Sequence, residues 1–135
     1  MNIALIAHDR KKELMAQFCT AYVGVFSRHA LCATAATASI IADATGLPVR
    51  SFMMGAQGGS EQIGMRIAYN GIDLVIHFYA PNDPNYADAV TYLSKLCDQN
   101  NVLYATNAAT AEALILSLDR GDLDWRDIVN PKNKE

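Results

Sequence analysis

A glycine-rich stretch in the middle of the chain combines residue types that could bind an anion. Gly55, Gly58 and Gly59 follow an apolar run at residues 47–54, and the polar residues 60–62 come directly after them. Glycines let backbone N–H groups approach a ligand closely, and a helix N-terminus favours negative charge. We expect a strand, a tight turn that binds an anion, and a helix that begins at Ser60. A plain connecting loop with a serine N-cap is the structural alternative.

Short polar segments follow four other apolar runs in the same way. The five apolar runs span residues 2–7, 30–33, 47–54, 74–78 and 102–105. The polar segments follow them at residues 8–9, 34–39, 55–61, 79–88 and 106–107. Ligands of parallel sheets bind beyond the carboxyl ends of the strands, so these five segments predict one pocket at that edge.

Helical spacing of apolar residues separates the five runs. The predicted helices cover residues 11–22, 40–44 with a closing Gly46, 60–69, 89–99 and 111–118. The alternation predicts an α/β fold, a single-domain three-layer sandwich of about five mostly parallel strands with helices on both faces. Continuous apolar strands imply burial on both faces of the sheet. We expect the polar tail, residues 121–135, to pack once through Trp125 and then to fray.

Composition bounds the class of protein. The chain has 135 residues, enough for one domain with a real core, and 51% of them are hydrophobic. A net charge of −3 argues against nucleic acid as the main partner. We found no membrane-spanning run and no signal peptide, so we expect a cytoplasmic protein. The three cysteines fit neither a zinc pattern nor a complete disulfide framework, and we expect buried thiols and no metal. They are Cys19, Cys32 and Cys97.

Four motifs, in order and spacing, resemble the methylglyoxal synthase family over nearly the whole chain. They are Ile-Ala-Leu-Ile-Ala-His-Asp at 3–9, Ala-Thr at 33–34, Met-Gly-Ala-Gln-Gly-Gly at 54–59 and Ala-Thr-Asn-Ala-Ala-Thr-Ala at 105–111. The resemblance implies a hexamer-forming α/β domain. It also implies an enzyme that converts dihydroxyacetone phosphate to methylglyoxal and inorganic phosphate without a metal or cofactor. Related domains in carbamoyl phosphate synthetase and the purine cyclohydrolase bind regulators or nucleotides instead.

The chain keeps part of the family's site. The family's His-Asp pair is His8 and Asp9, and the lysine that follows it is matched by Lys12. The phosphate loop, Thr-Gly-Thr-Thr-Gly in the family, keeps Thr34 and Thr37 but loses one threonine and both glycines. The glycines at 55, 58 and 59 are all kept.

Other family positions have changed. The catalytic aspartate after the double glycine is Ser60, and the acid of a Trp-Asp-Pro motif is Ala80. The Pro-His-Asp-Pro-Asp motif keeps only its last acid, Asp88, and loses its histidine. Enediol formation needs a positioned base, and general-base catalysis contributes roughly 10²–10⁴-fold to a rate. A serine without an activating partner does not supply such a base near neutral pH.

Several carboxylates remain as candidate bases: Asp9, Glu61, Asp83 and Asp88. Asp9 is equally well explained as a helix N-cap. Glu61 is one residue past the family's position, which turns a helical side chain by about 100°. Among the histidines, His8 is expected to contact ligand, and His77 to be a core histidine with its hydrogen bonds satisfied.

Two functions of different classes remain. The first, which the lost acids favour, is a protein that binds and sequesters a phosphorylated small molecule or nucleotide-type ligand without lyase activity. The alternative is a divergent, active methylglyoxal synthase. The resemblance and the high hydrophobic content also lead us to expect a homo-oligomer, and the family's assembly implies a hexamer.

The expected ligand contacts are the same for both functions. Backbone N–H groups near Gly55 to Gly59 and Thr37 would bind the anion, with Lys12 supplying charge unless it is merely solvated. Tyr79 or Tyr86 would offer a ring on which a base or sugar stacks. The expected ligand-binding residues are His8, Lys12, Thr34, Thr37, Gly55, Gly58, Gly59, Ser60, Tyr79, Tyr86, Asp88 and Asn107, with Asp9 and Glu61 as candidate catalytic bases.

Overall fold

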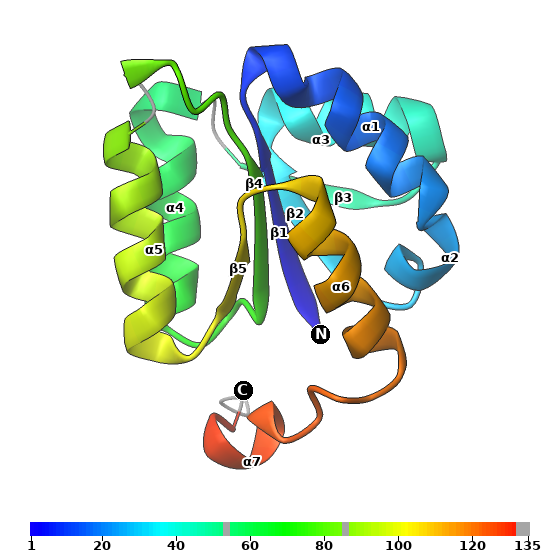
Figure 1. The fold of residues 1–135 in the computed structure, drawn as a ribbon, viewed down its shortest axis with the longest axis vertical. Coiled ribbons are helices and arrows are strands. Elements are labelled where there is room, and N and C mark those ends of the chain that lie inside the picture. The colour runs from blue at the N-terminus through cyan, green and yellow to red at the C-terminus, as the bar shows by residue number, and fades with distance from the viewer. Residues whose placement is uncertain (53–54, 85–86, 132–135) are drawn as a thin grey trace.

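Five parallel strands form one sheet in the order β3-β2-β1-β4-β5 in the computed structural model, which describes residues 1–52, 55–84 and 87–131 (Figure 1). The strands are β1 (Asn2–Ala7), β2 (Ala30–Thr34), β3 (Val49–Phe52), β4 (Leu74–Phe78) and β5 (Leu103–Ala105). In the register of the central strands, Leu5 of β1 pairs with Ala33 on one side and Ile76 on the other. This confirms the predicted fold class.

Helices cover both faces of the sheet, as Figure 1 shows. One layer contains α1 (Lys12–Ala21), α2 (Val23–Phe26), α3 (Ala35–Thr45) and α6 (Ala108–Asp119). The other contains α4 (Gly55–Ala68) and α5 (Ala87–Asn100). A short 3₁₀ helix, η1 (Asp9–Lys11), follows β1, and α7 (Arg126–Val129) lies near the C-terminus. Crossovers between parallel strands are right-handed. The chain moves outward in the sheet from β1 to β3 and then returns to the other side of β1 to form β4, so α4, the helix of that connection, lies on the second face.

The alternation of side chains along the strands divides the core into two clusters. Ile3 and Leu5 of β1 pack under the α1–α3–α6 layer, whereas Ala4 and Ile6 pack under the α4–α5 layer. Both central strands are therefore buried on both faces, as predicted. The edge strand β3 differs because Arg50 and Ser51 are exposed. Burial on both faces is thus wrong for this strand.

At two positions the backbone or its neighbours explain why the residue is glycine. Gly46 ends α3 with φ = 74°, and its amide N–H donates to the carbonyl of Ala42, which is the expected left-handed helix end. At Gly64 of α4, any added Cβ would collide with the ring and hydroxyl of Tyr92 on α5. The absence of a side chain at Gly64 therefore lets the two helices pack closely.

The helix after β3 begins earlier than the sequence predicts. We expected a glycine turn at residues 55–59 and a helix from Ser60, but α4 begins at Gly55. Ser60 consequently lies inside the helix, so its predicted role as N-cap is wrong. Ile63 and Ile67 of the same helix are fully buried against the sheet. Such packing outweighs the roughly 1 kcal/mol by which a glycine disfavours a helix.

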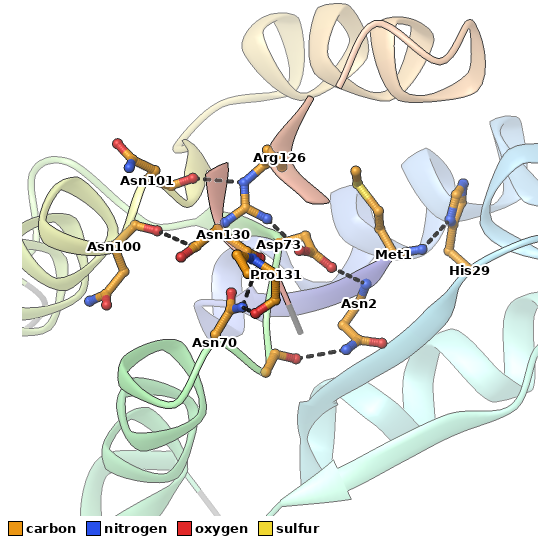
Figure 2. A network of polar contacts seen from close by, with 11 residues as sticks. Met1, Asn2, His29, Asn70, Asp73, Asn100, Asn101, Arg126, Asn130 and Pro131 are labelled. Atoms are coloured by element: carbon orange, nitrogen blue, oxygen red, sulfur yellow. Dashed lines mark hydrogen bonds and ion pairs between the residues drawn. The ribbon is translucent and has the colours of Figure 1, made fainter. Parts of the chain in front are cut away.

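The C-terminal segment is held by polar contacts rather than by its tryptophan. Trp125 is 47% exposed, whereas Arg126 is 1% exposed and forms an ion pair with the equally buried Asp73. Figure 2 shows that Arg126 Nε also donates to the carbonyl of Asn101, at 2.8 Å. The side chain of Asn70 donates to the carbonyls of Asn130 and Pro131, at 2.9 Å each. The predicted anchoring through Trp125 is therefore wrong.

The three cysteines are free and buried, as expected. Burial raises the pKa of the Cys32 thiol to about 11 and those of Cys19 and Cys97 to about 12. Within the described part of the chain, none of the helices is long and apolar enough to cross a membrane.

Candidate functional site

The strand order reverses between β1 and β4, and the candidate site lies where these two neighbours end. The chain winds from β1 outward to β3, then returns to place β4 on the other side of β1. Parallel sheets bind ligands at such a point, outside the carboxyl ends of the strands. His8 directly follows β1, and its amide N–H donates to the carbonyl of Phe78 at the end of β4, at 2.9 Å. The backbone thus fixes His8 at the switch point.

Two hydrogen bonds orient the imidazole of His8. Nδ1 accepts from the backbone N–H of Arg10 at 2.9 Å, which assigns the ring proton to Nε2. Nε2 lies 3.2 Å from Oδ2 of Asp83, which it faces across the switch point. His8 is 7% exposed, while the Asp83 side chain is 24% exposed. The buried Nε2–H of His8 therefore lies next to the Asp83 carboxylate, which solvent can reach.

The start of α3, after the strand that neighbours β1, is the candidate anion site. Thr34 ends β2, the neighbour of β1, and its hydroxyl donates to that of Thr37 at 3.3 Å. Both threonines are buried. The first N–H groups of a helix have no partner within the helix, and its dipole attracts negative charge. The structure thus places Thr34 and Thr37 together at the start of α3, where the sequence predicts that a phosphate binds.

Asp9 lies outside the buried part of the site. Its side chain is 83% exposed and forms an ion pair with Lys12, whose side chain is 16% exposed. The hydrogen bond and charge of Lys12 hold the pKa of Asp9 below its usual range. His8 supplies the cap of η1 and Lys11 precedes α1, so the alternative role of Asp9 as N-cap is wrong. A carboxylate with a lowered pKa is also a weaker base.

The other predicted residues lie around the same edge with differing exposure. Glu61 on α4 and Asp88 in the first turn of α5 are exposed, and Ser60 is half-buried. Asn107 is the N-cap of α6, because its Oδ1 accepts from the N–H of Thr110 at 2.9 Å. Tyr79 is half-buried, with its ring 5.9 Å from that of His77. Tyr86 and the side chains at 55–59 lie outside what the structure describes.

Asp83 is the residue whose importance the sequence did not single out. It was one of four remaining candidate bases, and 75 positions separate it from His8. Its place in a proline-flanked loop after β4 was the available signal. Only the parallel pairing of β1 with β4 brings that loop to His8.

His77 is a satisfied core histidine, as predicted. It is 2% exposed, and its Nδ1 lies 2.7 Å from the hydroxyl of Tyr104 on β5. Burial lowers its pKa from 6.5 to about 4. Its ring is therefore uncharged at neutral pH.

We expect His77 to make the fold sensitive to acid. Its folded pKa is depressed, so the unfolded chain binds the proton more readily between pH 6.5 and 4. The contribution of His77 to the free energy of unfolding should be fully present above pH 6.5, and the free energy of unfolding should fall by roughly 3 kcal/mol as the pH drops to 4. Urea unfolding at several pH values measures this slope. His77→Gln, which does not titrate, should flatten it, and an unchanged slope in that variant would refute the assignment.

Comparisons with known proteins identify the family and agree with the fold. Residues 15–106 match the family model of the MGS-like domain. A methylglyoxal synthase from Caldicellulosiruptor saccharolyticus is 57% identical over 98% of this chain and 94% of its own length. One from Oceanobacillus iheyensis is 47% identical over 100% of this chain and 97% of its own length. The crystal structure of methylglyoxal synthase from Elizabethkingia anophelis NUHP1 superposes with a TM-score of 0.78 at 34% identity, covering 84% of this chain and 76% of that one. The chain therefore belongs to the family of MGS-like domains.

Proposed function

We propose that this chain is a carbon–oxygen lyase that converts dihydroxyacetone phosphate to methylglyoxal and inorganic phosphate. The names of its full-length relatives support this enzyme over the ligand-sequestering protein that the altered motifs favoured. The single observation that carries the proposal is the pairing of His8 with Asp83 at the switch point, 3.2 Å apart. This pair would supply a base and a proton donor, although Ser60 and Ala80 carry no acid where the resemblance implies one.

Asp83 and His8 have complementary roles in the proposed reaction. The Asp83 carboxylate removes a proton from the hydroxyl-bearing carbon next to the substrate carbonyl, and its partial exposure leaves room for substrate. The Nε2–H of His8 turns from Asp83 to the carbonyl oxygen, where it stabilises the developing negative charge. The product of this step is an enediol, in which the electrons of the broken C–H bond form a carbon–carbon double bond.

Loss of phosphate follows from the enediol. The terminal hydroxyl of the enediol loses its proton and becomes the aldehyde carbonyl, the carbon–carbon double bond shifts to the phosphate-bearing carbon, and the C–O bond to phosphate breaks with its electron pair leaving on phosphate. The start of α3, Thr34 and Thr37 bind the phosphate through backbone N–H groups and hydroxyls. The released enol takes a proton on its terminal carbon and loses the proton on its oxygen to become methylglyoxal, so the overall reaction needs no oxidant or reductant.

Binding without turnover is the second candidate function. It is favoured by Ser60 and Ala80, which carry no acid where the resemblance implies one, and by the ion pair of Asp9 with Lys12. In that case the site would hold a phosphorylated small molecule through the same α3 start. The two functions share their ligand contacts and differ only in proton transfer.

One experiment separates the two candidates. Purified chain is incubated with dihydroxyacetone phosphate, and methylglyoxal and inorganic phosphate are both quantified. The proposal predicts equimolar amounts of the two, well above the spontaneous reaction in a protein-free control. Calorimetric titration of the same ligand is run in parallel. Saturable binding with product at the spontaneous rate would establish the binding protein and reject the enzyme.

A further inference from the structure

A groove lies on the face of the sheet that α4 and α5 cover, between α4 and the edge strand β3. Its volume is about 1100 Å³, comparable with small-molecule sites. The lining continues to the start of β1, to Asp73, which precedes β4 and pairs with Arg126, and to Asp127 of α7. The lining residues that matter below are Arg50, Phe52, Met65, Arg66 and Tyr69. None of them belongs to the candidate site at His8.

Two arginines converge on one aromatic ring in this groove. The guanidinium carbons of Arg50 and Arg66 lie 6.0 and 5.5 Å from the centroid of Phe52. Arg50 comes from β3 and Arg66 from α4, so the two arginines meet at this groove from different elements. Among the described residues, neither guanidinium has an ion pair or a hydrogen bond. Nε of Arg66 is moreover buried without an acceptor.

An anion bound in the groove would stabilise this arrangement. Two like charges repel each other, and a buried donor without an acceptor loses the hydrogen bonds that water would give it. Both guanidinium groups lie within cation–π reach of Phe52. The N–H groups of a guanidinium match the oxygens of a phosphate or carboxylate in bidentate fashion.

The α4 side of the groove presents two large apolar side chains. Met65 lies on α4 and Tyr69 directly follows that helix, and they are 59% and 74% exposed. Tyrosine rings stack on other aromatic rings, and methionine adapts its shape to them. We propose that the groove binds a small aromatic phosphate ester, with its phosphate on Arg50 and Arg66 and its ring against Tyr69 and Met65. This site is independent of the lyase chemistry proposed above.

An amide NMR titration of the full chain with phenyl phosphate tests the proposal site by site. Amide signals of residues 50–52 and 62–69 are expected to shift in a saturable way. Arg66→Gln and Arg50→Gln should each weaken this binding roughly 10- to 100-fold, the usual effect of losing a charged hydrogen bond. Arg120→Gln is the matched control, because Arg120 is exposed and pairs with Asp122 outside the groove. It should leave the affinity unchanged.

Three further measurements test the role of the phosphate, the independence from lyase activity and the assembly of the chain. Phenol, which lacks the phosphate, should not bind in the groove, and Arg66→Gln should retain the methylglyoxal-forming activity of wild type. The proposal is wrong if Arg66→Gln binds phenyl phosphate as tightly as wild type, or if Arg120→Gln weakens binding equally. It is also wrong if light scattering shows that Arg66→Gln dissociates an assembly while phenyl phosphate never binds. A second copy of the chain would then occupy the groove.

Discussion

Arg126→Ala is expected to destabilise the fold by about 3–5 kcal/mol, the usual cost of breaking a buried ion pair. The substitution leaves the carboxylate of Asp73 buried without its partner, and both residues are only 1% exposed. It also removes the 2.8 Å hydrogen bond to the carbonyl of Asn101 (Figure 2). Urea unfolding followed by the fluorescence of the single tryptophan, Trp125, measures the change.

Two control variants distinguish the ion pair from a general loss of charge. Arg120→Ala removes an exposed arginine that is paired with Asp122, and such pairs contribute only about 0–1 kcal/mol. Arg126→Met combined with Asp73→Asn removes both charges and should recover part of the loss. A midpoint for Arg126→Ala equal to that of Arg120→Ala would show that the buried pair does not hold the C-terminal segment.

Asp83→Asn is expected to lower kcat for methylglyoxal formation by roughly 10²–10⁴-fold, the usual contribution of a general base. Asparagine has nearly the same shape and can still bond to His8, but it cannot take the substrate's proton. His8→Gln should also lower kcat, because it removes the Nε2–H that faces the carbonyl oxygen. Groups that act together are not additive, so the double variant should be little slower than the slower single one.

Asp43→Asn is the matched control for this series. Asp43 is exposed on α3 and lies outside the candidate site, so its loss removes the same charge without touching the reaction. The affinity for inorganic phosphate should remain close to wild type in all these variants, since Thr34, Thr37 and the start of α3 are intact. A kcat for Asp83→Asn equal to that of Asp43→Asn would exclude Asp83 as the base.

Much of the fold follows from local patterns in the sequence. The runs at 2–7 and 74–78 are predicted with the bounds that the structure has, because their residues are continuously apolar. The left-handed helix end at Gly46 follows from its residue type. The convergence of polar segments follows from parallel pairing, which places all carboxyl ends at one edge. These features depend on neighbours in sequence or on a general rule of topology.

The features that were missed depend on distant partners. His8 and Asp83 are 75 positions apart, and Arg126 and Asp73 are 53 apart, so no local pattern indicates either pair. Arg126 stands in a polar segment that looks like a fraying tail, yet a buried carboxylate makes it the anchor. The start of α4 was misplaced for a related reason, since packing of Ile63 and Ile67 outweighs the turn preference of the glycines.

Phosphorus NMR of wild-type protein with dihydroxyacetone phosphate tests the proposed activity most directly. Bound ester, free ester and inorganic phosphate give separate signals, so binding and elimination are observed in one sample. We predict that the ester signal falls while that of inorganic phosphate rises by the same area, much faster than without protein and much slower with Asp83→Asn. An ester signal that shifts or broadens on binding but keeps its area would contradict the lyase and show a protein that only binds its ligand.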